Sequence, residues 1–171
     1  MSSTIIDTTR KRDPGTLTNT ANVMSAMPQY QPEGGATKCN FFLIDFANTV
    51  FGCHDLDGLM ANQMVLDGFR LHDFFKPLYD RTKGFSDRDA AFQNAQSYAN
   101  SGYLIIYGWY NSAGHGHVMV GVPGSLQEGW GGVMVPSVAQ AGETVSPSMR
   151  LSGGLRLERG NSDDFVVYGW L

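Results

Sequence analysis

The sequence predicts an α+β fold, with N-terminal helices packed on an antiparallel β-sheet. Up to Gly102, apolar residues recur at helical spacing; after it, β-branched and aromatic residues cluster in short runs between glycine-containing turns. The chain has 171 residues, 42% of them hydrophobic and 16% charged, and shows no internal repeat. This is the profile of a single globular domain.

Residues 1–16 are polar and predict a flexible lead-in to one domain that spans residues 17–171. The domain is expected to open with a short helix over residues 17–27, which Pro28 ends.

The stretch that follows predicts a buried helix with a cysteine at its start. From Cys39 the apolar side chains follow the i, i+3, i+4, i+7 spacing of one helix face, and Gly52 is placed to end the helix. A helix N-terminus carries partial positive charge and unpaired N–H groups, which favour a thiolate and lower the pKa of a thiol. Cys39 is therefore either a nucleophile or, like most lone cysteines, a buried core residue.

Two more helices are expected before the sheet. One covers residues 59–69, and the other begins at Ser86, where Asp89 completes a capping-box pattern, and ends at Gly102. The aromatic segment 71–78 between them is irregular and predicts either packing over the core or the wall of a cleft.

The remaining elements are strands. They are expected at residues 103–110, 117–122, 133–141, 155–157 and 165–170. Pro136 inside the third indicates an edge strand or a bulge. Helices followed by such a run indicate an antiparallel meander.

A reactive cysteine needs a base, and His117 is the best placed of the four histidines. It opens a strand, on the face opposite Val118 and Val120, where it can meet a helix-start cysteine. The alternative is an ordinary hydrogen-bonded strand histidine. The other three, His54, His72 and His115, are expected in surface or packing positions.

A third polar group is expected to hold the imidazole. Gln140 is an amide in an apolar strand, where it needs a partner, and its carbonyl can accept a hydrogen bond from His117. Ser137 is the runner-up, and a Gln140 that pairs only with backbone is a third reading, because strand register does not follow from sequence.

These residues, in this order, resemble the NlpC/P60 and CHAP superfamily of papain-like cysteine peptidases. The resemblance covers residues 20–170 in motif order. Its segments are Lys38-Cys39-Asn40-Phe41-Phe42 with Asp45, Ala61-Asn62-Gln63-Met64, Gly116-His117-Val118 and Pro136-Ser137-Val138-Ala139-Gln140-Ala141-Gly142.

The resemblance implies a papain-like fold and hydrolysis of an amide bond in the stem peptide or cross-link of peptidoglycan. By position, Cys39 would be the nucleophile, His117 the base and Gln140 the orienting residue. Asn62 matches a recurring position and, with Trp109, is the candidate for substrate binding. No metal or cofactor is expected, since the two cysteines and four histidines lack zinc-site spacing.

The sequence also predicts the partners of the protein and the place where it acts. A formal charge of −4 without a basic stripe argues against nucleic acid as a partner, and no apolar stretch is long enough to cross a bilayer. The N-terminus lacks a secretion-signal pattern. The resemblance then implies a monomeric type VI secretion amidase effector, made in the cytoplasm and acting in the periplasm or wall of a target bacterium. A cognate immunity protein would be its partner.

The alternatives are a phage endolysin with the same chemistry, a Cys–His acyltransferase or transglutaminase-like enzyme, and an inactive binding domain.

Overall fold

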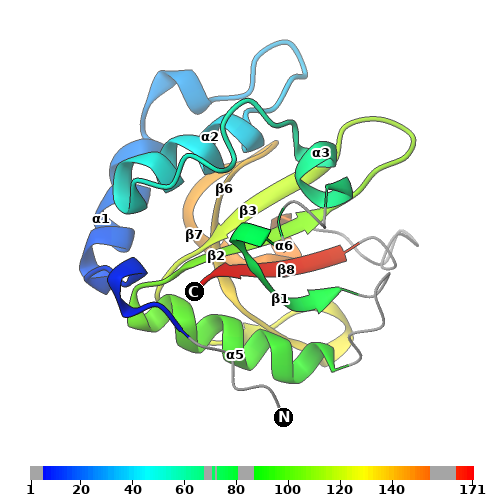
Figure 1. The fold of residues 1–171 in the computed structure, drawn as a ribbon. Helices are drawn as coiled ribbons and strands as arrows, with labels where there is room; N and C mark the ends of the chain where they lie inside the picture. The colour runs from blue at the N-terminus through cyan, green and yellow to red at the C-terminus, as the bar shows by residue number, and fades with distance from the viewer. Residues whose placement is uncertain (1–5, 68–70, 72, 81–86, 155–164) are drawn as a thin grey trace.

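The computed structural model describes residues 6–67, 71, 73–80, 87–154 and 165–171, and it confirms the α+β class (Figure 1). Among these residues the main sheet has six antiparallel strands in the order β1-β8-β2-β3-β6-β7. They are β1 (Lys76–Asp80), β2 (Leu104–Trp109), β3 (His117–Gly121), β6 (Ser137–Ala141), β7 (Val145–Arg150) and β8 (Phe165–Trp170). A small hairpin pairs β4 (Gln127–Glu128) with β5 (Met134–Val135).

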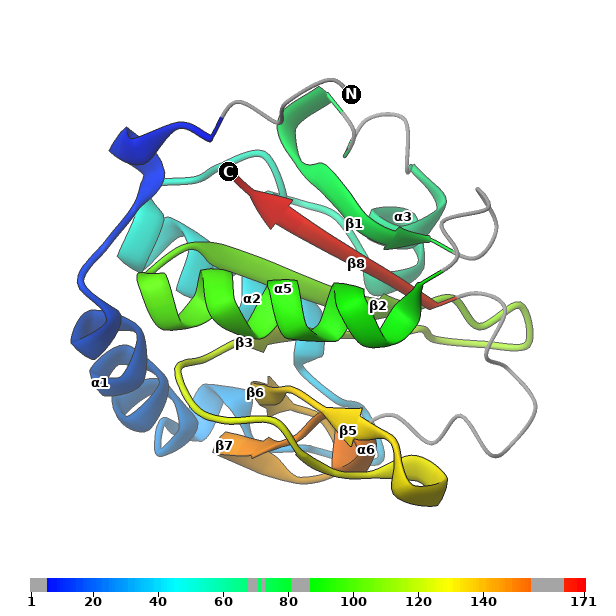
Figure 2. The same ribbon diagram turned by 90° about the horizontal axis from the view of Figure 1, so that it is seen from below.

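Helices cover both faces of this sheet. The helical elements are α1 (Pro14–Ser25), α2 (Cys39–Phe46), α3 (Ala61–Leu66), α5 (Arg88–Ser101) and α6 (Leu151–Gly154), with short turns η1 (Thr8–Arg10), η2 (Pro28–Tyr30), η3 (Ala47–Phe51) and η5 (Trp130–Gly132). Figure 2 shows α5 lying across one face, with α2 behind the sheet. In the described part of the chain, no helix has the length and apolar character needed to cross a membrane.

The alternation of side chains along the strands explains why the core has two parts, one on each face of the sheet. Alternate residues of β2 point to opposite faces, so Leu104 and Ile106 join the core under α1, α2 and α3, while Ile105 and Tyr107 join the core under α5. All four are buried. A strand covered on both faces therefore shows an almost continuous apolar run rather than alternation.

The helix predicted from Cys39 is confirmed, and both of its ends are where the sequence placed them. Cys39 is the first residue of α2, which runs on through the π-helical turn η3 to Gly52. Gly52 has a φ of 62°, the left-handed conformation that glycine adopts at helix ends.

The first helix begins earlier than predicted. It starts at Pro14 rather than at residue 17, because Asp13 caps it by accepting a hydrogen bond from the Gly15 N–H at 2.8 Å and proline suits the first helical position. Ahead of it, the Arg12 guanidinium donates to the backbone carbonyls of Val50 and Phe51, each at 3.0 Å. This part of the lead-in is thus tied to the end of η3.

The long helix α5 is confirmed, with a different cap. Asp87 is the N-cap, since its carboxylate accepts from the Ala90 N–H at 3.0 Å, whereas Ser86 lies outside the described residues. Gly102 ends the helix with a φ of 97°, and a Cβ there would collide with the Arg12 carbonyl.

The prediction of the sheet was incomplete. The sequence did not predict two edge strands, β1 and β7. Each contains a proline, Pro77 or Pro147, which argues against a strand in the sequence but is tolerated at the edge of a sheet. The predicted strand 133–141 is divided at Pro136, where the chain leaves the small hairpin and enters β6. The predicted strand 155–157 lies outside the described residues. The predicted helix 59–69 is shorter in the structure, where α3 begins at Ala61 and ends at Leu66 with Asp67 as its C-cap; residues 68 and 69 lie outside the described residues.

Chain order also departs from helices followed by a meander. Helix α5 separates β1 from β2, and β8 returns to lie between those two strands. Only β2, β3, β6 and β7 follow one another in the meander that the sequence predicted.

Candidate active site

The candidate site lies where two neighbouring strands diverge. β3 and β6 are paired at Val120 with Ala139 and, further on, the Val122 N–H donates to the Ser137 carbonyl at 3.2 Å. Continued in the same register, the ladder would join the Val118 N–H to the Ala141 carbonyl. No such pairing is present between these two described residues, so the strands form a fork at this end.

The start of α2 occupies that fork. The Lys38 N–H donates to the Ala141 carbonyl at 3.2 Å, and the Val118 N–H faces Cys39, where it is one of the groups that lower the pKa of the thiol. The Ala141 carbonyl released by the diverging strands is thereby satisfied. The first residue of α2 is thus held against the strand that carries His117 and the strand that carries Gln140.

The surroundings of Cys39 favour its thiolate. Only 5% of the residue is exposed, and burial on its own raises the pKa of a thiol. The hydrogen bond and charge of His117, the Val118 N–H and the side chain of Thr37 together outweigh burial, so the pKa of Cys39 lies below its usual value.

His117 is held between Cys39 and Gln140. Its Nε2 lies 2.7 Å from the Oε1 of Gln140. The Gln140 amide nitrogen donates to the Thr144 carbonyl at 3.0 Å, which identifies Oε1 as the acceptor and Nε2 of His117 as the donor. This leaves Nδ1 as the imidazole nitrogen available to Cys39.

The same contacts favour the charged form of His117. Burial lowers the pKa of an imidazole, but the hydrogen bond to and charge of Cys39, the bond to Gln140 and the negative charge of Glu143 raise it, and the raising influences prevail. A lowered thiol pKa beside a raised imidazole pKa shifts the proton from sulfur toward nitrogen and so favours the thiolate–imidazolium form of the pair.

Gln140 has little freedom to move. Its amide is flanked by two glycines at which a side chain would intrude. A Cβ on Gly142 would lie 3.3 Å from Nε2 of Gln140 and 3.1 Å from Cε1 of His117, and a Cβ on Gly154 would collide with Oε1 of Gln140. The turn after β6 and the end of α6 therefore close tightly around the His117–Gln140 contact.

Ser137, the alternative third residue, is not near His117. Its hydroxyl donates to the Ser125 carbonyl at 3.1 Å, and it lies opposite Val122, at the other end of β3. This alternative is wrong because the register of β6 against β3 brings Gln140 to the fork and takes Ser137 away from it.

The two candidate substrate-binding residues flank His117. Trp109 is its cross-strand partner on β2 and is half-buried against the core under α5. Asn62, on α3, directs its amide at the loop between β2 and β3, with bonds to the backbone of Asn111 and Gly114.

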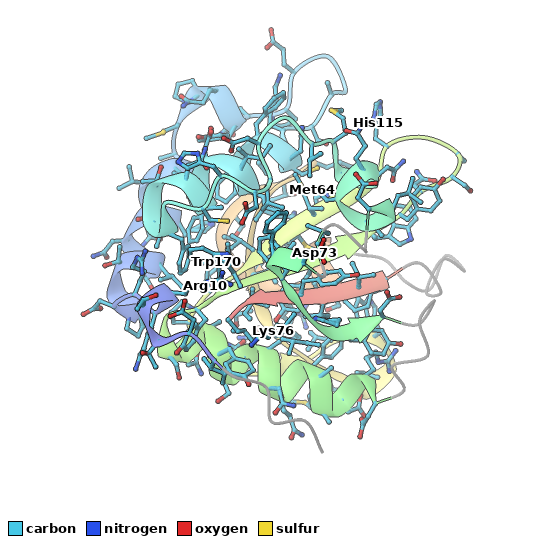
Figure 3. All side chains as sticks on the ribbon, viewed as in Figure 1. Arg10, Met64, Asp73, Lys76, His115 and Trp170 are labelled. Atoms are coloured by element: carbon cyan, nitrogen blue, oxygen red, sulfur yellow. The ribbon has the colours of Figure 1, made fainter. Side chains whose placement is uncertain are left out.

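Other polar and aromatic side chains take structural positions. Asp45 accepts a 2.6 Å hydrogen bond from the Tyr30 hydroxyl, which ties η2 to α2. Phe75 is fully buried in the core, and Trp130 packs on Phe92. His115 is exposed at the outer surface, near the end of α3 (Figure 3).

His54 lies away from the site. His54 lies 3.0 Å from Asp57 on the surface, as the sequence predicted, and His72 falls outside the described residues.

Sequence reasoning missed three contributors to the site. Thr37, two residues before the cysteine, helps to lower the pKa of the Cys39 thiol, and the charge of Glu143 helps to raise the pKa of His117 from the turn after β6. The third is the backbone N–H of Val118, which leaves no trace in residue type. For Thr37 the available signal was a hydroxyl just ahead of the helix start.

No protein-family model matches the chain, and no curated protein matches it at a significant level. Among the residues that the structure describes, no group of three or more His, Cys, Asp or Glu side chains is arranged to hold a metal ion.

Proposed function

We propose that this chain is a cysteine hydrolase with a papain-like fold of the NlpC/P60 type, which cleaves an amide bond in the peptide stems or cross-links of peptidoglycan. The observation that carries the proposal is the chain of contacts from Cys39 through His117 to Gln140. A nucleophile bonded to a base that is itself oriented by a third group is the arrangement of nucleophilic hydrolysis.

In the first step the Cys39 thiolate attacks the carbonyl carbon of the amide. The negative charge that forms on the oxygen is stabilised by the Cys39 N–H at the positive end of α2. The His117 imidazolium gives its Nδ1 proton to the leaving nitrogen as the C–N bond breaks. The products of this step are a free amine and a thioester on Cys39.

In the second step neutral His117 takes a proton from water, and the resulting hydroxide attacks the thioester carbonyl. The C–S bond breaks, Cys39 leaves as a thiolate and the product is a carboxylic acid. His117 ends the cycle protonated. Throughout, Gln140 keeps Nε2 occupied, so that Nδ1 is the nitrogen that exchanges protons with the reacting groups.

Peptidoglycan is proposed as substrate from the motif resemblance, which the arrangement of helix start, histidine strand and next strand supports. The same resemblance proposes a secreted antibacterial effector, with a phage endolysin as the alternative. Both use the same chemistry, so the bond that is cut does not distinguish them.

The test is digestion of purified sacculi with the wild-type chain and with the Cys39→Ala variant. The proposal expects released muropeptides that carry a new free amine and a new carboxylate, from the wild type alone. If mass spectrometry finds no release, or equal release by the variant, hydrolysis by this site is excluded. A new amide formed with an added amine would indicate acyl transfer in its place.

A further inference from the structure

The loop between β2 and β3 leads directly into His117, and one side chain outside the loop holds it. Asn62, on α3, accepts from the Asn111 N–H at 2.9 Å and donates to the carbonyls of Asn111 at 2.9 Å and Gly114 at 2.8 Å. In Figure 1 this loop lies beside α3. A single side chain thus bonds both the beginning and the end of the turn.

These bonds occupy the Asn62 amide. An asparagine side chain has two N–H donors and one carbonyl oxygen, and here both donors and the oxygen are engaged by loop backbone. A substrate carbonyl that bound an Asn62 N–H would have to displace one of the two donated bonds. The geometry therefore favours a role within the protein over a direct contact with substrate.

These contacts of Asn62 with the loop, which we call the clamp, extend to the residue before His117. A Cβ on Gly116 would collide with Oδ1 of Asn62 and would lie 2.6 Å from the Trp109 carbonyl. Gly116 is buried, so the backbone that enters β3 rests directly on the Asn62 amide and on the strand opposite.

Asn111 completes the clamp from inside the loop. Its amide donates to the His115 carbonyl at 3.1 Å and accepts from the Ala113 N–H at 3.1 Å. Together the two asparagines bond the loop backbone at five places, and this is the loop from which the imidazole of His117 must be aimed at Cys39.

We propose that Asn62 is a positioning residue, which fixes the β2–β3 loop so that the His117 imidazole stays between Cys39 and Gln140. The proposal rests on the proposed function, because it assigns Asn62 to the working of that Cys–His pair. Its first test, however, needs no peptidoglycan.

That test is the pH dependence of Cys39 alkylation by iodoacetamide, followed by mass spectrometry of the Cys39 peptide. In the wild type, Cys39 should react at pH values where an ordinary thiol is protonated. In Asn62→Ala, a loosened His117 supports the thiolate less, and the alkylation rate at pH 6 should fall about tenfold, with the curve displaced to higher pH. Cys53 in the same sample is the internal reference.

Two variants make the result specific. Asn62→Asp keeps the shape and the bond from the Asn111 N–H but removes both donated bonds, and it should displace the curve in the same direction. Gln63→Ala is the matched control on the same helix. It removes only the 2.8 Å bond from the Met60 N–H that caps α3, and the alkylation curve should stay where it is.

Kinetics on a soluble stem-peptide fragment separate the roles further. Positioning predicts a lower kcat with KM within about twofold of the wild type, since the substrate contacts remain. A raised KM with an unchanged alkylation curve would overturn the proposal in favour of substrate binding by Asn62. A lower melting temperature alone, with curve and kcat unchanged, would overturn it in favour of a purely structural role.

Failure of the proposed function would give a different result from failure of the positioning role. A wild-type chain that cleaves no peptidoglycan but shows low-pH alkylation of Cys39, displaced by Asn62→Ala, retains the positioning role and excludes only the substrate.

Discussion

Cys39 and Cys53 have similar exposure and opposite chemistry. Both are free, and 5% and 2% of their surfaces are exposed. The pKa of Cys39 lies below the usual value, whereas burial raises the pKa of Cys53 to about 11, and the negative charge of Asp55 adds to the rise against a backbone hydrogen bond.

The difference lies in what each sulfur faces. Cys39 meets an imidazole, a backbone N–H and a hydroxyl in the fork between β3 and β6, while the side chain beside Cys53 is the carboxylate of Asp55, 3.8 Å away. Burial thus does not decide whether a cysteine is reactive. The donors that replace water decide it.

The largest effect is expected from removing each sulfur in turn. Cys39→Ala should lower peptidoglycan hydrolysis by about 10⁴-fold or more, because the nucleophile is lost. Cys53→Ala should keep wild-type activity and lower the melting temperature by a few degrees, at a cost of about 1 kcal/mol of folding free energy. Muropeptide release and a thermal melt measure the two outcomes, and loss of activity in both variants would contradict the contrast.

His117→Ala should make the two cysteines more alike. It removes the hydrogen bond and the charge that support the Cys39 thiolate and leaves the burial, so the pKa of Cys39 should rise toward that of Cys53. Hydrolysis should fall by about 10²- to 10⁴-fold with the loss of general acid–base catalysis. Alkylation of both cysteines across pH checks the first effect, and an unchanged Cys39 curve would separate His117 from the thiolate.

Gln140→Ala should have a smaller effect. The lost hydrogen bond to a charged imidazole is worth about 1.5–3 kcal/mol, so activity should fall about 10- to 100-fold. Ser137→Ala is the matched control on the same strand and should stay within about twofold of the wild type. Equal losses in the two variants would mean that folding, and not orientation of His117, explains them.

The parts of the site that depend on neighbouring residues could be predicted from the sequence. The periodicity after Cys39 and the glycine at position 52 predict α2 correctly, because helix faces and helix ends depend on residues a few positions apart. The strand that begins at His117 was found for the same reason. Even the contact of Gln140 with His117 was predicted, although only as one of three readings.

The rest of the site depends on contacts between segments that are distant in the sequence, and it could not be predicted. Choosing between Gln140 and Ser137 requires the register of β6 against β3, which is set by side-chain pattern and turn geometry together. The support that Val118 gives to the sulfur comes from a backbone group, and Asn62 acts on a loop 49 residues away. Residue type alone carries none of this information.

The smallest effect is expected from Glu143, which influences the difference between the two cysteines only through the charge of His117. Activity requires the Cys39 thiolate and the His117 imidazolium together, so the pH profile should rise as the pair forms and fall as the imidazole loses its proton. The charge of Glu143 is one of the influences that raise the pKa of His117.

Glu143→Gln should therefore move the alkaline limb of the profile to lower pH and leave the acid limb nearly in place. Because Glu143 is exposed, salt should screen its charge, and the displacement should shrink between low and high ionic strength. The pH dependence of kcat/KM at two salt concentrations measures both effects. A displacement in the opposite direction, or one that salt leaves unchanged, would mean that Glu143 acts through the shape of the turn after β6, whose glycine packs against the imidazole, and not through its charge.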